Sequence, residues 1–247
     1  MQWQKIRIFN ANFIKILAAI LMLIDHVGLL FFPRFPIFRY IGRISMPLFA
    51  FAVAEGCRYT KDKVKHFALI FGLAVACQLV YYFAMESLYI CILVTFSFSI
   101  ILIYALQNFK KQLFDGNSLQ KTLLSGVLFL VLVYLTYRIC QLIEIDYGIW
   151  GCLLPVFASI PDLRGIENKP KSISFIDCLP IRVLCFSIGL FFMVRAANFS
   201  EFSLYALLSL PILFLYNGEK GKWNTKYFFY LFYPLHLAAL QIIYWCL

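Results

Sequence analysis

Charged residues are scarce in this chain of 247 residues. Asp, Glu, Lys and Arg make up 14% of it, against roughly 25% in ordinary soluble domains, whereas hydrophobic residues make up 63%. A water-soluble fold of this length could not hide so much apolar surface. The shortage of charge therefore excludes a soluble domain and favours helices that lie within a bilayer.

Cysteine motifs, repeats and polar domains are also lacking. The eight cysteines form no Cys-x-x-Cys pair and no His-Cys cluster at metal-ligand spacing, so the sequence predicts neither a disulfide nor a metal site. No tandem repeat or low-complexity tract is present, and the longest polar stretch, 161–177, has the composition of a loop. We therefore expect one transmembrane domain over residues 1–247.

Long apolar runs make up most of the sequence. Crossing about 30 Å of hydrocarbon takes about 20 residues of helix, and several runs approach that length. The predicted helices are 12–32, 36–55, 65–85, 88–108, 121–143, 147–160, 179–196, 200–216 and 225–246. The sequence thus predicts an all-α, polytopic transmembrane bundle of about nine helices. Because 147–160 is short enough to be re-entrant, eight or ten elements also fit.

The positively charged residues are concentrated in the loops between the apolar runs. A net charge of +10 could indicate nucleic-acid binding, but Lys and Arg form no continuous basic face. They gather instead in alternate loops, as the positive-inside rule and contact with anionic lipid would require. We therefore expect lipid rather than nucleic acid as the partner of these charges, and a cytoplasmic N-terminus.

Ionisable residues inside the apolar runs are candidates for function, because charge within a bilayer is costly. Lys15 and His26 lie eleven positions apart, so helical geometry places them within about 20° of one face and about 16 Å apart. A cation near the inner mouth suits phosphate, and an imidazole deeper in the membrane can accept a proton. A lysine that reaches the lipid headgroups explains Lys15 equally well.

Three further candidates have two interpretations each. Asp25 points about 100° away from His26 and could orient a neighbouring helix or pair with Arg43. Arg43 opens the segment 42–47, where its guanidinium could hold an anion or a carbonyl oxygen. Glu55 is as consistent with a salt bridge as with substrate binding.

The last apolar run contains a second histidine, His236. Pro234 frees a backbone carbonyl beside it, and this combination suggests the wall of a cavity. Tyr230 and Tyr233 recur at helical spacing and could bind substrate or only pack within the bundle. Because both histidines lie about midway along their helices, we expect His26 and His236 to approach each other.

Several blocks in this order resemble the TraX family of membrane proteins, which is associated with N-terminal acetylation of conjugative pilin. The resemblance covers nearly the whole chain and rests on residues 24–26, 42–51, 54–56, 146–151, 215–218, 226–230 and 233–237. TraX-like proteins are in turn similar to the acyltransferase-three superfamily, in which a first-helix basic residue, ten residues and a histidine form a signature tied to acyl-CoA. Lys15 and His26 fit that spacing.

The resemblance implies an integral membrane acyltransferase of the bacterial cytoplasmic membrane. His26 would be the general base, with Asp25, Arg43 and His236 as further catalytic residues and Lys15 and Arg43 as contacts for the donor. Acetyl-CoA, or another acyl-CoA, would be a co-substrate rather than a bound cofactor. The acceptor, a peptide, a glycan or a small molecule, would present an amine or hydroxyl, with Glu55, Tyr230 and Tyr233 as binding residues.

Two other function classes stay open at this point. Buried Asp, His and Arg in broken helices are also typical of proton-coupled transporters, although no internal symmetry is visible. A membrane assembly protein without catalysis would tolerate substitution of both histidines.

Overall fold

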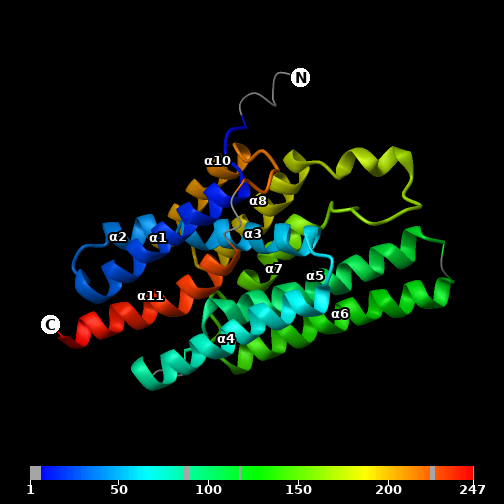
Figure 1. Ribbon diagram of the computed structural model, residues 1–247. Coiled ribbons are helices and arrows are strands. Elements are labelled where there is room, and N and C mark those ends of the chain that lie inside the picture. Colours follow the sequence, from blue (N-terminus) through cyan, green and yellow to red (C-terminus); the bar gives the residue numbers. More distant parts are fainter. Residues whose placement is uncertain (1–6, 86–88, 117, 223–225, 247) are drawn as a thin grey trace.

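The computed structural model describes residues 7–85, 89–116, 118–222 and 226–246, and for 84–85 and 226–230 the backbone alone. Every predicted segment contains helix, and the protein is an all-α polytopic bundle (Figure 1). The uninterrupted helices are α1 (Ala11–Phe31), α4 (Lys63–Met85), α5 (Ile92–Phe114), α6 (Leu119–Leu142), α7 (Gly148–Ser159), α8 (Leu179–Ala196) and α11 (Lys226–Cys246). Helices α5 and α6 follow each other in the chain and form a hairpin that extends from the bundle toward the lower right of Figure 1.

The second predicted helix, 36–55, is divided in the structure. It consists of α2 (Ile37–Gly42) and α3 (Ser45–Tyr59), separated by Arg43 and Ile44. Pro47 explains the break, because a proline ring clashes with the carbonyl group four residues earlier, here that of Arg43. The break places Arg43 between two helices instead of within one.

The segment predicted as one helix over 200–216 is also irregular. It consists of α9 (Glu201–Leu204), the 3₁₀ helix η3 (Tyr205–Leu208) and α10 (Ser209–Phe214). Pro211 cannot donate a backbone hydrogen bond, and its ring disfavours a regular α-helix at Leu207. The loop after α7 contains one more 3₁₀ turn, η2 (Lys171–Ile176).

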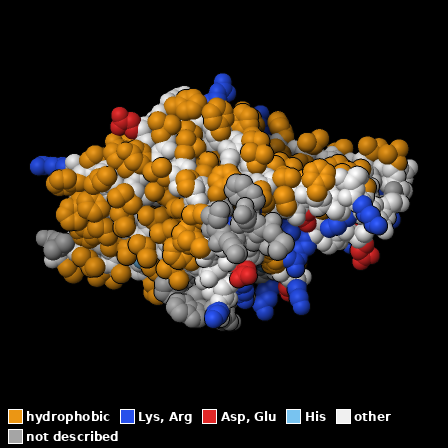
Figure 2. Space-filling view, turned by 90° about the horizontal axis from the view of Figure 1, so that it is seen from above, with side chains coloured by type: hydrophobic (Ala, Val, Ile, Leu, Met, Phe, Trp, Pro, Cys, Tyr) orange, Lys and Arg blue, Asp and Glu red, His pale blue; other side chains and the backbone are white. Residues whose placement is uncertain are grey.

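Length and composition distinguish the helices that can cross a membrane. Among the residues whose side chains the structure describes, six helical segments are long and apolar enough, the second of which includes the break between α2 and α3: Ala11–Phe31, Ile37–Tyr59, Lys63–Phe83, Ile92–Phe114, Leu119–Leu142 and Leu179–Ala196. Three shorter apolar helices, Gly148–Ser159, Glu201–Phe214 and Leu231–Cys246, account for the other predicted segments. On the face seen in Figure 2, hydrophobic side chains cover most of the surface, and Lys and Arg lie at its margins, most of them toward the lower right.

Helix α3 lies at the centre of the bundle. It contacts α1, α5 and α7, and its residues Leu48, Ala50 and Phe51 are almost completely buried. Helix α11 contacts both α1 and α4. Helices α1, α3, α4, α5 and α11 therefore surround a common interior space.

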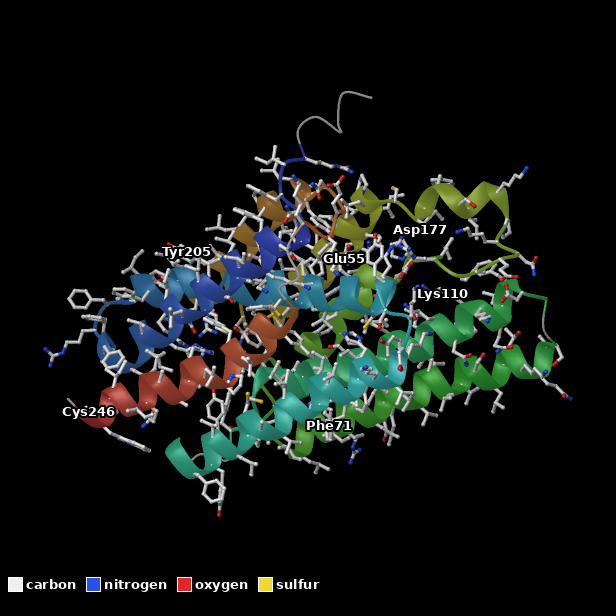
Figure 3. All side chains as sticks on the ribbon, viewed as in Figure 1. Glu55, Phe71, Lys110, Asp177, Tyr205 and Cys246 are labelled. Atoms are coloured by element: carbon white, nitrogen blue, oxygen red, sulfur yellow. The ribbon has the colours of Figure 1, made fainter. Side chains whose placement is uncertain are left out.

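Buried ion pairs attach the loop 160–178 to the end of the bundle that carries Lys110 and Asp177 in Figure 3. The Lys110 ammonium donates to the carbonyl oxygens of Ser159 (2.8 Å) and Asp162 (2.5 Å). Arg58 forms ion pairs with Asp162 and Asp177. Each buried charge is thereby compensated, as a low-dielectric interior requires.

Candidate functional site

A cavity of about 1190 Å³ lies between α1, α3, α4, α5 and α11. Most residues that the sequence nominated reach it. The predicted site residues on its wall are Lys15, Asp25, His26, Arg43, Glu55 and Tyr233. Tyr230 belongs to the residues whose side chains lie outside the described part of the chain. Among the described residues, no three His, Cys, Asp or Glu side chains cluster as metal ligands.

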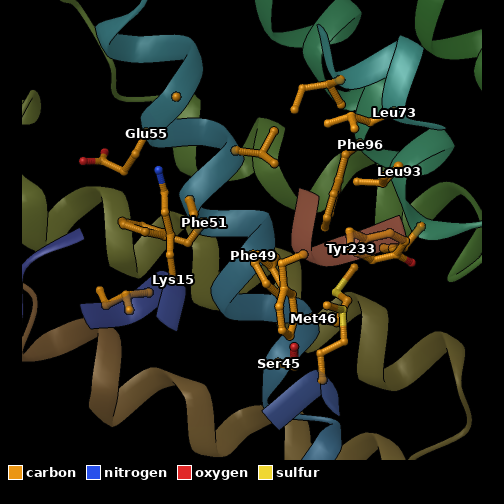
Figure 4. A pocket seen from close by; sticks show the side chains of 18 of the residues that line it. Lys15, Ser45, Met46, Phe49, Phe51, Glu55, Leu73, Leu93, Phe96 and Tyr233 are labelled. Atoms are coloured by element: carbon orange, nitrogen blue, oxygen red, sulfur yellow. The ribbon is translucent and has the colours of Figure 1, made fainter. Parts of the chain in front are cut away.

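Helix α1 places Lys15 and His26 on the same wall. Asn10 caps the helix by accepting a hydrogen bond from the Phe13 backbone N–H at 3.0 Å, and the helix then continues without interruption to Phe31. Both side chains line the one cavity, which confirms the shared face expected from their spacing. In Figure 4 the Lys15 amine points toward Glu55.

The two histidines meet, as expected. Their ring centroids are 5.1 Å apart in an edge-to-face arrangement. His236 is 6% exposed and packs against His26, Phe232 and Tyr233. It does not line the cavity itself, contrary to expectation, because Phe232 and Tyr233 supply the cavity wall from α11. The pairing joins two residues that lie 210 positions apart in the chain, on its first and last helices.

Backbone carbonyls select the tautomer of both rings. The Nδ1 atom of His26 lies 2.9 Å from the Met22 carbonyl oxygen, and Nδ1 of His236 lies 2.9 Å from that of Phe232. A carbonyl only accepts hydrogen bonds, so each Nδ1 carries the hydrogen and each Nε2 keeps a lone pair. An Nε2 lone pair is what a general base needs.

Asp25 pairs with a different arginine from the one proposed. Its Oδ2 accepts a hydrogen bond from Arg39 Nη1 on α2 at 2.8 Å, which agrees with the alternative that Asp25 orients a neighbouring helix and not with a direct pairing to Arg43. Gly42 explains the arrangement, because a Cβ at that position would lie 2.3 Å from Asp25, and the glycine lets α2 pack against α1. Arg39, one turn before Arg43, then faces Asp25.

Arg43 instead contacts Tyr147, a residue that sequence reasoning did not nominate. Arg43 Nη1 donates to the Tyr147 hydroxyl oxygen at 2.9 Å. Tyr147 has a φ of 59°, in the left-handed region that residues other than glycine rarely occupy. Strained backbone often marks functional sites. The signal available from the sequence was the family-like block 146–151, which contains this turn.

Asp146 extends the same wall. Its Oδ1 accepts a hydrogen bond from the Tyr89 hydroxyl at 2.5 Å, and its carbonyl oxygen accepts one from Thr95 at 2.8 Å. Burial raises the pKa of Asp146 to about 6, although the Tyr89 hydrogen bond and the charge of Arg43 both act to lower it. Sequence reasoning missed this carboxylate because it lies between two helices.

Glu55 has two partners on the opposite part of the wall. It forms an ion pair with Arg182, and its Oε2 accepts a hydrogen bond from the Tyr216 hydroxyl at 2.8 Å. The salt-bridge interpretation of Glu55 is therefore confirmed, while its contact with substrate stays a prediction. Arg182 on α8, 3% exposed, is the buried cation that Glu55 compensates.

One end of the cavity is basic and its middle is apolar. Lys65, His66 and Lys220 line the basic end together with Lys15, and the carboxylates of Glu55 and Asp62 also line the cavity. The Nδ1 atom of His66, the third histidine, is 2.7 Å from the Tyr104 hydroxyl. Figure 4 shows the middle section, where Phe49, Leu73, Leu93, Phe96 and Tyr233 are labelled.

Comparison with known proteins places the chain in a family. The family described as TraX protein matches residues 10–244. The probable fimbrial assembly protein FimC, serogroup H1, of Dichelobacter nodosus is 26% identical over 245 residues, which cover 94% of each chain. An uncharacterized protein of Rickettsia prowazekii (strain Madrid E) is 43% identical over 61 residues, 25% of this chain and 23% of that protein. No solved structure matches. With nearly its whole length matched, the chain belongs to the TraX family.

Proposed function

We propose that this protein is an integral membrane acyltransferase that moves an acyl group, most simply acetyl, from acyl-CoA to an amine or hydroxyl. The observation that carries the proposal is the single cavity that Lys15 and His26 share. One wall thus presents a cation for a phosphorylated donor and a base for an acceptor, about 16 Å apart along α1. An extended pantetheine arm spans a comparable length.

The basic end of the cavity supports entry of the donor from that side. Lys15, Lys65 and Lys220 would attract the phosphate groups of CoA, and the apolar middle section would surround the pantetheine arm. The thioester would then reach His26. Under the positive-inside rule this end faces the cytoplasm, where acyl-CoA is available, with the N-terminus on the same side of the bacterial cytoplasmic membrane.

The chemistry follows from the arrangement of His26 and Arg43. The acceptor oxygen or nitrogen attacks the thioester carbonyl carbon while His26 Nε2 takes its proton. Arg43 stabilises the negative charge that develops on the carbonyl oxygen. The carbon–sulfur bond then breaks, and the proton returns from His26 to the departing CoA thiolate. His236, in contact with His26, would keep that ring oriented or share its proton.

The acceptor is proposed from the relative's name. The Dichelobacter nodosus protein is a probable fimbrial assembly protein, so a pilin-like subunit presented in the membrane is the first acceptor to test. Acetylation of such a subunit would add 42 daltons to its mass.

The test uses the purified protein in lipid nanodiscs with radiolabelled acetyl-CoA. Wild-type protein should bind the donor and release CoA slowly by hydrolysis when no acceptor is present. His26→Ala should bind the donor and lose that release. Wild-type protein that neither binds nor consumes acetyl-CoA would contradict the proposal.

A second candidate, a fimbrial assembly protein without catalysis, is favoured by the same relative's name. It predicts that His26→Ala and His236→Ala support fimbria formation at the wild-type level in a strain that lacks the chromosomal copy. Loss of fimbriae with folded His26→Ala protein would instead favour catalysis.

A further inference from the structure

Arg43 differs in its partner from three other buried or half-buried arginines of the bundle. Arg39 pairs with Asp25, Arg58 with Asp162 and Asp177, and Arg182 with Glu55. Within the part of the chain that the structure describes, no carboxylate lies within ion-pair distance of Arg43. Its hydrogen-bonding partner there is the neutral hydroxyl of Tyr147, at 2.9 Å.

A phenol and a carboxylate have different effects on a guanidinium. Both accept a hydrogen bond from it and hold it in place, but only the carboxylate neutralises its charge. In a cavity with a low dielectric constant, a guanidinium fixed by a neutral group keeps an electrostatic attraction for any anion that enters. Arg43 Nε is in addition buried without a hydrogen-bond partner among the described residues.

The turn that carries Tyr147 is built to deliver this hydroxyl. Tyr147 has a φ of 59° and Gly148 one of 54°, and the two together reverse the chain between α6 and α7. At Gly151 a Cβ would lie 2.6 Å from the Tyr147 Cβ and 3.1 Å from Thr95 Cγ2, so only glycine leaves room for the tyrosine. Thr95 also holds the turn by donating to the Asp146 carbonyl oxygen.

The nearby carboxylates form their hydrogen bonds with other groups, although Asp25 Oδ1 is buried without a hydrogen-bond partner among the described residues. Asp146 accepts a hydrogen bond from Tyr89, and Asp25 is paired with Arg39. Both line the same cavity as Arg43, so their charges are close by, yet neither makes the direct contact that would neutralise Arg43. The arrangement keeps one arginine of the cavity wall available.

We infer that Tyr147 is a positioning residue that fixes Arg43 while leaving its positive charge free to bind an anion, namely the carbonyl oxyanion that forms during acyl transfer. This inference rests on the proposed function for the identity of the anion. The free charge itself does not depend on that function.

Two substitutions at one position separate positioning from charge. Tyr147→Phe removes the hydroxyl and leaves Arg43 charged but unanchored, so kcat should fall roughly 10-fold to 100-fold through lost alignment. Tyr147→Glu keeps an acceptor for Arg43 but neutralises it, so kcat should fall about as far as in Arg43→Gln, on the order of 10²–10³-fold. Neither variant should change the KM for acetyl-CoA more than a few-fold.

Tyr40→Phe is the matched control, because the Tyr40 hydroxyl donates a hydrogen bond to Glu201 outside the cavity.

Coupling between the two residues gives a stricter readout. In Arg43→Gln, the further change Tyr147→Phe should cost almost nothing, because no guanidinium remains for the hydroxyl to hold. Additive losses in the double variant would mean that Tyr147 acts independently of Arg43 and would overturn the inference. So would a Tyr147→Glu protein with wild-type kcat.

A second measurement needs no acyl donor. With sulfate as the probe, the rise in unfolding temperature between low and high sulfate, at constant ionic strength, should be smaller for Tyr147→Glu and Arg43→Gln than for wild type and Tyr40→Phe. Equal rises in all four proteins would show that the charge of Arg43 is not free. If sulfate discriminates as expected but wild type does not consume acetyl-CoA, the proposed function fails and the free Arg43 charge stands.

Discussion

The imidazole rings of His26 on α1 and His236 on α11 lie edge to face, with their centroids 5.1 Å apart. Each ring donates through Nδ1 to the carbonyl oxygen one turn earlier in its own helix, so neither spends its Nε2 on the backbone. The contact therefore brings two basic nitrogens into one small region of the membrane domain. Only His26 also shares a helix face with a cation that lines the cavity.

The two histidines should differ in their importance. We predict that His26→Ala lowers acyl transfer by a factor on the order of 10²–10⁴, the usual range for loss of a general base. His236→Ala should leave more residual activity, because it removes a neighbour of the base and not the base. Transfer rates of the purified variants at saturating donor measure this. A folded His26→Ala protein with a near wild-type rate would disprove the assignment of the base.

Lys15 should act through the donor. Lys15→Gln removes a cation from the basic end of the cavity, so the KM for acetyl-CoA should rise about 10-fold while kcat changes little. Initial rates against donor concentration measure both constants. Lys121→Gln, a change at an exposed lysine outside the cavity, is the control. An unchanged KM in Lys15→Gln would return this residue to the role of a headgroup anchor.

Glu55 should matter first for stability. Glu55→Gln leaves the guanidinium of Arg182 buried and uncompensated, and breaking a buried pair in this way costs about 3–5 kcal/mol of unfolding free energy. Adding Arg182→Met should recover most of that loss, because no buried charge then remains. Thermal unfolding in detergent compares the three proteins. If the double variant is as unstable as Glu55→Gln, the ion pair is not the cause.

Asp146 should make stability depend on pH. Its pKa is raised from 3.8 to about 6 in the folded protein, so the folded state binds this proton more tightly than the unfolded state does. The contribution of Asp146 to stability is therefore greatest below about pH 4 and declines as pH rises through 6. The unfolding temperature of wild type minus that of Asp146→Asn should fall between pH 4 and pH 7 and level off above. A difference that is flat or rises with pH would contradict the raised pKa.

Membrane orientation can be tested by labelling. The alternation of basic loops predicts that a cysteine at position 61 faces the cytoplasm and one at position 34 faces outward. In a background with Cys246→Ser, which removes an exposed native thiol, an impermeant maleimide should label intact cells that carry Arg34→Cys but not those that carry Lys61→Cys. The reverse pattern would invert both the topology and the side of donor entry.

Much of the fold was predictable because membrane helices are specified locally. A helix of about 20 apolar residues satisfies its backbone hydrogen bonds within itself, whatever surrounds it. Each predicted segment accordingly contains helix. The breaks were harder to predict. Pro47 and Pro211 each interrupt a helix within a continuous apolar run. A hydropathy profile does not show these breaks, because it takes no account of the backbone N–H that proline lacks.

The shared face of Lys15 and His26 was also determined by the sequence alone, since it depends only on the 100° step within one helix. Which charges meet was decided by the tertiary structure. Asp25 pairs with Arg39 instead of Arg43, Glu55 meets Arg182, and Arg43 meets Tyr147. Each of these contacts joins two segments whose separation and relative rotation are set by helix packing. The spacing of residues within one helix carries no information on which face a second helix presents to it.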